Sequence, residues 1–207
     1  GRTAELRGLA HPSREVVWVT GSEGTVLLSA DGGTTWGARS VPGGAALDFR
    51  DVEAFDASTA WLLAAGPGDL GRIYRTSDGG ATWQLQFRNP AGEGFLNALA
   101  FWDGRRGLAL GDPIHGRFQI LRTEDCGVHW EPIPEAGMPA ALVGEGAFAS
   151  SGTCLRVGPG GEAWFVTGSA ARTRVFHSLD GGRTWSVADT PVPAGQASRG
   201  LFTLTLL

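Results

Sequence analysis

The chain has 207 residues, a formal net charge of −4 and 42% hydrophobic residues, which suits one substantial domain or two small ones. All 17 basic residues are arginine and form no basic stripe. This excludes chemistry that needs a lysine amine and argues against nucleic acid as a partner. Two cysteines are too few for a disulfide scaffold, so Cys126 and Cys154 either pair once or stay as separate buried thiols. No apolar run reaches the length of a membrane span.

In chain order, the sequence predicts four groups of four short strands, separated by clusters of Gly, Pro and Asp. The strands are expected at 5–10, 15–21, 25–29 and 34–40; at 50–56, 59–66, 71–76 and 81–87; at 96–102, 106–111, 117–123 and 128–133; and at 146–150, 162–168, 173–178 and 183–189. The groups define blades at 4–40, 50–89, 95–134 and 145–190, with 199–207 as the innermost strand of a fifth. The segment 151–161 receives no strand assignment.

A nine-residue phrase lies between the third and fourth strands of every group. It reads LSADGGTTW from Leu28, RTSDGGATW from Arg75, RTEDCGVHW from Arg122 and HSLDGGRTW from His177. The four aspartates follow one another at intervals of 47, 47 and 55 residues. A period in the forties is typical of one four-stranded propeller blade.

The residue types of the phrase suit a tight turn better than a ligand site. An Asp side chain can accept unpaired backbone N–H groups, a Gly supplies positive φ, and a Trp can wedge between neighbouring sheets. These structural positions are Asp31, Gly33 and Trp36; Asp78, Gly80 and Trp83; Asp125, Gly127 and Trp130; and Asp180, Gly182 and Trp185. A calcium loop would need more carboxylates, and Cys126 with His129 lacks a second zinc-ligand pair nearby, so no metal is expected.

The phrase S/T-x-D-x-G-x-T-W resembles the Asp-box, or BNR, repeat of sialidases, glucan hydrolases, sortilin-type receptors and the photosystem II stability/assembly factor-like family. VVWVTGSEGTVLLSADGGTTW, GDPIHGRFQILRTEDCGVHW and GEGAF are similar to bacterial members of the last family, over nearly the whole chain. The resemblance implies an all-β propeller of antiparallel four-stranded blades, six or seven in number. Four such phrases and a terminal strand would then be a fragment of it.

The same resemblance implies a non-catalytic scaffold without a cofactor, exported to the periplasm or the extracellular space, or to the thylakoid lumen in photosynthetic relatives. Its partner would be a protein or peptide, such as an assembly intermediate of a membrane protein, with a carbohydrate as an alternative. The binding loops would gather on the face opposite the Asp-boxes. The candidate binding residues there are Arg50, Asp112, His115, Arg117, Glu145 and Arg199.

Simpler roles remain open for these residues: Asp112 as a turn residue, Glu145 as the ion-pair partner of Arg117, and His115 as a solvated side chain. The alternative function is a glycoside hydrolase on the same fold, with Asp112 and Glu145 as the two carboxylates that flank the bond. A sialidase also needs a tyrosine nucleophile. The single tyrosine, Tyr74, falls on a predicted third strand, away from the channel.

Overall fold

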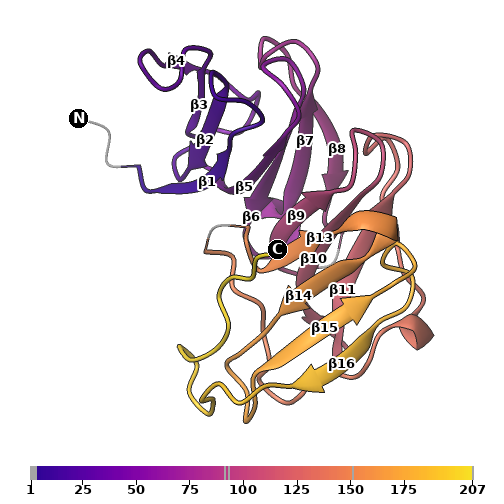
Figure 1. Cartoon of the computed structure of the whole chain (residues 1–207). Helices are drawn as coiled ribbons and strands as arrows, with labels where there is room; N and C mark the ends of the chain where they lie inside the picture. Colours follow the sequence, from indigo (N-terminus) through magenta and orange to yellow (C-terminus); the bar gives the residue numbers. More distant parts are fainter. Residues whose placement is uncertain (1–3, 91, 93, 151, 207) are drawn as a thin grey trace. The chain divides into compact units, whose positions relative to one another are not determined.

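The computed structural model describes residues 4–90, 92, 94–150 and 152–206 (Figure 1). Its strands form four antiparallel sheets of four strands each, and within every sheet the strands follow their order in the chain. The chain divides into two compact units, residues 1–96 and 97–207. Each unit therefore contains two of the four predicted blades, and the all-β propeller-blade architecture expected from the sequence is confirmed.

The first unit consists of two sheets around one apolar core. Its strands are β1 (Leu6–Ala10), β2 (Val17–Gly21), β3 (Val26–Ser29) and β4 (Gly37–Ala38), followed by β5 (Asp48–Ala54), β6 (Ala60–Ala65), β7 (Arg72–Thr76) and β8 (Gln84–Arg88). Strand β6 is buried at all six positions, as expected of the second strand of a blade covered on both faces. Trp18, Phe49 and Leu62 are fully buried at the centre of this core.

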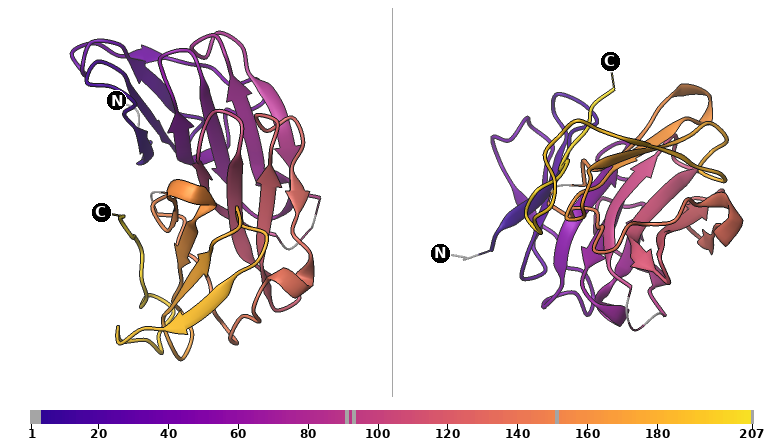
Figure 2. Two further views of the ribbon diagram at one scale, coloured as in Figure 1. Left: turned by 45° about the vertical axis from the view of Figure 1, so that its right-hand side comes forward. Right: turned by 90° about the horizontal axis from the view of Figure 1, so that it is seen from below.

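The second unit has the same plan. Its strands are β9 (Leu96–Phe101), β10 (Gly107–Ile114), β11 (Arg117–Thr123) and β12 (Glu131–Pro132), followed by β13 (Leu155–Val157), β14 (Ala163–Val166), β15 (Arg174–Ser178) and β16 (Ser186–Asp189). Rings from both sheets meet in its core: Phe118 of β11 lies 5.1 Å from Phe165 of β14, which stacks on Phe176 at 4.3 Å. The strands of each unit can be followed by their colours in Figure 2.

The four repeated phrases all form the predicted turn between third and fourth strands, and we call these turns the box turns. Gly33, Gly80, Gly127 and Gly182 have φ values of 89, 79, 84 and 76°, as predicted. The residue before each also has positive φ, and in the third box turn this residue is Cys126, at 67°. At position 182 a second reason requires glycine: a Cβ on Gly182 would lie 2.7 Å from Leu108 of the neighbouring sheet.

Two sequence-based strand assignments in the second unit were wrong. Residues 146–150 form no strand, and the inner strand of the fourth sheet is β13, inside the segment that the sequence left unassigned. Likewise, described residues 201–206 form no strand of a fifth sheet: Leu201 N–H and Leu204 N–H donate to Thr167 and Thr153 within the fourth-sheet region. Leu207 lies outside the described residues. Both segments have short apolar patterns that fit a strand and a packed extended loop equally well.

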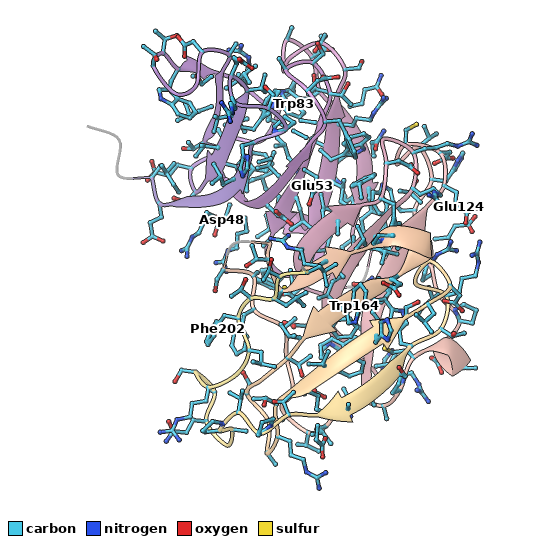
Figure 3. The ribbon with its side chains drawn as sticks, viewed as in Figure 1. Asp48, Glu53, Trp83, Glu124, Trp164 and Phe202 are labelled. Carbon is cyan, nitrogen blue, oxygen red and sulfur yellow. The ribbon has the colours of Figure 1, made fainter. Side chains whose placement is uncertain are left out.

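The box tryptophans also differ from one another. Trp83, Trp130 and Trp185 are buried. Trp83, labelled in Figure 3, meets Trp18 of the neighbouring sheet edge-on at 6.2 Å, as a wedge should. Trp36 is 44% exposed, because among residues 4–90 no earlier sheet packs against its turn.

None of the helices among the described residues has the length and apolar character that a bilayer crossing requires.

Candidate binding site

Two of the predicted binding residues, Arg50 and Asp112, occupy equivalent irregularities in different sheets. The register of β5 with β6 shifts between Phe49 and Asp51, and the register of β10 with β11 shifts between Gly111 and Pro113. A bulge leaves one residue out of the ladder and re-aims its side chain, which is why bulges recur near binding sites. Sequence reasoning placed Asp112 in a loop. In the structure β10 continues to Ile114, and the hairpin turn is only His115 and Gly116.

Asp112 is an acid of this region whose pKa is shifted by its surroundings. Its Oδ1 accepts hydrogen bonds from Asn97 Nδ2 and from the Ala147 backbone N–H, both at 3.0 Å. Burial raises the pKa of Asp112, and these two hydrogen bonds only partly oppose the rise. Asn97, which lies 1% exposed on β9, was not predicted, because nothing in the strand pattern distinguishes it from a core position. Asp112 is therefore a half-buried carboxyl group whose pKa is raised by burial, suited to hydrogen bonding in either protonation state.

Glu145 lies two residues before Ala147, so the structure brings both predicted acids to one segment. Its side chain has no exposed surface. Oε1 accepts from Thr167 Oγ1 at 2.6 Å and from Arg174 Nε at 2.9 Å, while Oε2 accepts from the Leu142 N–H at 2.8 Å and pairs with Arg174 Nη2. The ion-pair partner is therefore Arg174, not Arg117. Both carboxylate oxygens are saturated by protein donors, so Glu145 serves as an internal brace.

The remaining predicted residues lie on loops and strand ends. His115 is exposed at the tip of the β10–β11 hairpin with φ at 51°. Arg117 begins β11 and donates to the Met138 carbonyl. Arg199 is exposed in the loop after β16, where its carbonyl accepts from Ser169 N–H. Arg50, in the first unit, pairs with Asp48 at 2.8 Å and lies 5.8 Å from the Phe95 ring centroid.

We call the part of the second unit that holds Asn97, Asp112, His115, Glu145 and Arg174 the loop edge. Close backbone approaches connect the loop edge to the part of the chain that follows β16. Gly146 bridges to Gly168, and Gly168 bridges to Gly200. A Cβ on Gly168 would lie 2.4 Å from the Gly200 Cα, so no larger side chain fits. Arg199 is thereby held near the segment 145–147, which carries Glu145 and donates the Ala147 N–H to Asp112, whereas Arg50 belongs to the other unit.

The four box aspartates behave as structural caps. Asp31 accepts from Thr35 Oγ1 at 2.6 Å, from Thr35 N at 2.8 Å and from Ser29 Oγ at 2.8 Å, and these bonds lower its pKa to about 2. Asp78 has the same partners, Thr82 and Thr76, and the same pKa of about 2. A charged carboxylate bound by several donors is stabilised in its ionised form. The aspartates are thus fully used within their own turns.

The third box turn shows how its unusual residues fit. His129 donates its backbone N–H to Asp125 at 2.9 Å and places Nδ1 2.6 Å from the other carboxylate oxygen. It thereby replaces the threonine of the other turns, and these contacts lower the pKa of Asp125 to about 2. Cys126 and Cys154 form no disulfide. The interpretation of this phrase as a structural turn, rather than half of a zinc site, agrees with this geometry.

A group of arginines at the box edge of the second unit escaped the sequence analysis. Arg105, Arg106, Arg122 and Arg183 line a cavity of about 580 Å³, together with Trp102 and Glu124. Glu124 follows the end of β11 at the periphery of its sheet (Figure 3). Residues 105–106, 122–124 and 183 are far apart in the chain, and only the stacking of the third and fourth sheets brings them together. In the sequence, the only sign of this group was that Arg122 and Arg183 lie within two of the nine-residue phrases.

No model of a known protein family matches the sequence. Photosystem II assembly protein Ycf48 of Synechococcus sp. (strain JA-2-3B'a(2-13)) is 25% identical over a match that covers 83% of the chain and 71% of the relative. Ycf48 of strain JA-3-3Ab is 24% identical, covering 72% of the chain and 54% of the relative. The chain resembles the Ycf48-like family of propeller proteins.

Solved structures agree with a Ycf48-like propeller fold. The structure of YCF48 bound to a D1 peptide matches with a TM-score of 0.54 and 18% identity, covering 89% of the chain and 68% of the neighbour. The GH74 enzyme of Niastella koreensis matches with a TM-score of 0.61 and 19% identity, covering 91% of the chain and 25% of the neighbour. At these identities the neighbours show the fold alone, which is a partial β-propeller.

Proposed function

We propose that the chain is a non-catalytic, exported binding scaffold whose partner is a protein or peptide, such as an assembly intermediate of a membrane protein. The Ycf48 relatives and the structure of YCF48 with a D1 peptide support this function. The proposed contact residues are Asp112, His115, Arg117 and Arg199 at the loop edge of the second unit, and Arg50 in the first. Glu145 and Arg174 hold the segment that positions Asp112.

The observation that carries the proposal is that the buried Glu145 carboxylate is fully hydrogen-bonded within the protein. A glycosidase carboxylate must reach the substrate as an acid, base or nucleophile. Glu145 has no exposed side-chain surface, and its two oxygens receive four hydrogen bonds, two of them from Arg174. Removing it from this pair would leave a buried cation, so the protein has a structural reason to keep it where it is. Asp112 by itself can bind a partner but does not make a carboxylate pair.

The test compares binding with hydrolysis. A fluorescein-labelled D1 peptide is titrated with the wild-type chain, with the double variant His115→Ala/Arg199→Ala, and with Arg14→Gln as a control at an exposed arginine of the first unit. We expect saturable binding that the loop-edge variant weakens at least fivefold and the control leaves unchanged. The alternative function is checked with xyloglucan and a sialoside as substrates. Turnover that Asp112→Asn abolishes, without loss of folding, would replace the scaffold by a glycosidase.

A further inference from the structure

The second unit carries an unusual concentration of positive charge at its box edge. The cavity of about 580 Å³ is lined by four arginines but by only two acids, Glu124 and Asp180, in a chain whose formal net charge is −4. Asp180 is occupied inside its own turn, where hydrogen bonds from Thr184 and Ser178 outweigh burial and keep its pKa at about 2. The cavity is therefore a locally cationic site in an acidic protein, which favours an anionic partner.

The arginines are held in place before any partner arrives. Arg122 Nε donates to the Gly181 carbonyl at 2.7 Å, and Arg183 Nη1 donates to the Asp180 carbonyl at 3.0 Å. Arg105 Nε donates to the Glu124 carbonyl at 2.8 Å. Because one N–H group of each guanidinium is already fixed by a backbone oxygen, less side-chain entropy is lost when the remaining N–H groups bind a partner.

The protein itself shows which ligand chemistry fits between these side chains. Glu124 Oε1 accepts from Arg122 Nη2 at 2.6 Å and from Arg183 Nη2 at 2.7 Å. Two guanidinium groups thus converge on one carboxylate oxygen, and this carboxylate is 55% exposed. The arrangement is a carboxylate site that an exposed internal side chain partly fills. A carboxylate from outside can share it or take its place.

A second cavity extends the same site over apolar surface. It has a volume of about 570 Å³ and is lined by Pro132, Ile133, Pro134 and Ala136, with Arg122 and Arg183 again in its wall. The adjacent edge strand β12 has only two residues, one of them Pro132, so it offers little backbone for strand addition. Recognition here must come from side chains: a carboxylate on the arginines and an apolar group on the proline-rich wall.

We propose that this groove, formed by Arg105, Arg122, Glu124 and Arg183 with the wall 132–136, binds an extended peptide segment in which acidic and aliphatic residues alternate. The inference adds to the proposed scaffold function a second site, at the edge opposite the loop edge, and a defined partner chemistry. It stands on the cavity and the charge arrangement, so it can succeed where the loop-edge site fails.

The probes are three fluorescein-labelled hexapeptides with alternating residues: glutamate–leucine, glutamate–glycine and glutamine–leucine. Titrated with the full chain and followed by fluorescence anisotropy, the glutamate–leucine peptide is expected to bind at least tenfold more tightly than either of the others. Equal binding of the glutamate–leucine and glutamate–glycine peptides would overturn the role of the apolar wall.

Two variants with matched controls test the arginines. Arg183→Gln should weaken binding of the glutamate–leucine peptide five- to twentyfold. Arg172→Gln, which removes another exposed arginine from an ion pair in the same unit, should leave it unchanged. Glu124→Gln removes the internal competitor and should strengthen binding three- to tenfold. Glu15→Gln makes the same charge change at an exposed position of the first unit, outside the groove, and should have less than a twofold effect. An unchanged affinity in Arg183→Gln, or a weaker one in Glu124→Gln, would overturn the proposal.

The loop-edge double variant His115→Ala/Arg199→Ala serves as the final control. It should bind the glutamate–leucine peptide as the wild type does. Loss of D1-peptide binding in this variant, with the hexapeptide unaffected, would separate the two sites. Loss of hexapeptide binding in it would contradict the location of the groove.

Discussion

The loop edge and the box edge of the second unit both hold acids against arginines, but they do so in opposite environments. At the loop edge, Glu145 is fully enclosed and its partner Arg174 has 8% of its side chain exposed. At the box edge, Glu124 is 55% exposed and divides one oxygen between Arg122 and Arg183. An enclosed pair is costly to break and therefore braces the fold, whereas an exposed pair contributes little and can exchange partners.

Breaking the enclosed pair should have the largest effect. Glu145→Gln leaves the Arg174 guanidinium buried without a counter-charge, and we expect a loss of about 3–5 kcal/mol in the free energy of unfolding. Urea denaturation measures the loss. The double variant Glu145→Leu/Arg174→Met removes both charges and should recover most of it. A loss below about 1 kcal/mol in the single variant would mean that the pair does not brace the segment 145–147.

The packing of a box turn against its neighbouring sheet comes next. Gly182 and Gly144 have nearly the same φ, 76 and 74°, but a Cβ at 182 would lie 2.7 Å from Leu108, whereas a Cβ at 144 meets no atom within 4 Å. Gly144→Ala should cost about 1 kcal/mol from backbone strain alone. Gly182→Ala should cost about 2–4 kcal/mol, because overpacking adds to the strain. Equal costs in thermal or urea unfolding would show that the turn gives way freely.

The box aspartates should make stability fall in acid over a defined range. Their folded pKa of about 2 lies below the ordinary value of 3.8, so they stabilise the fold above pH 4 and lose this contribution as the pH falls towards 2. Thr184→Ala removes the Oγ1 donor to Asp180, which should raise the Asp180 pKa and move acid unfolding to slightly higher pH. Carboxyl NMR titration follows the shift. Thr205→Ala, which removes a hydroxyl that donates to the Leu206 carbonyl, should not move it.

The third box turn should yield the smallest change, and a favourable one. Cys126 has φ at 67° where the other three turns have glycine. Cys126→Gly should stabilise the protein by up to about 1 kcal/mol, because glycine adopts this conformation without steric strain. Ser169→Gly, at φ of 68° outside a box turn, gives the comparison. A destabilised Cys126→Gly variant would show that the thiol contributes more through its contacts than it costs in backbone strain.

Much of this fold could be predicted because the signals are local. Alternating apolar strands and four Asp-Gly-Trp phrases at blade spacing predicted the four sheets and every described strand except β13, since a turn of this chemistry needs only neighbouring residues. The prediction failed at 146–150 and 201–206, where a short apolar run can lie in a strand or in a packed loop. Only its partners decide which, and they are distant in the chain.

By itself, the sequence determined the blade pattern, the box turns and the roles of their aspartates, because each depends on contacts within a few residues. Only the tertiary structure decided how the charges are used. It assigned Glu145 to Arg174, 29 residues away, and Arg183 to Glu124, 59 residues away. The pairing of charged side chains, and whether they are enclosed or exposed, depends on how sheets stack, and sheet stacking is not written in any local pattern.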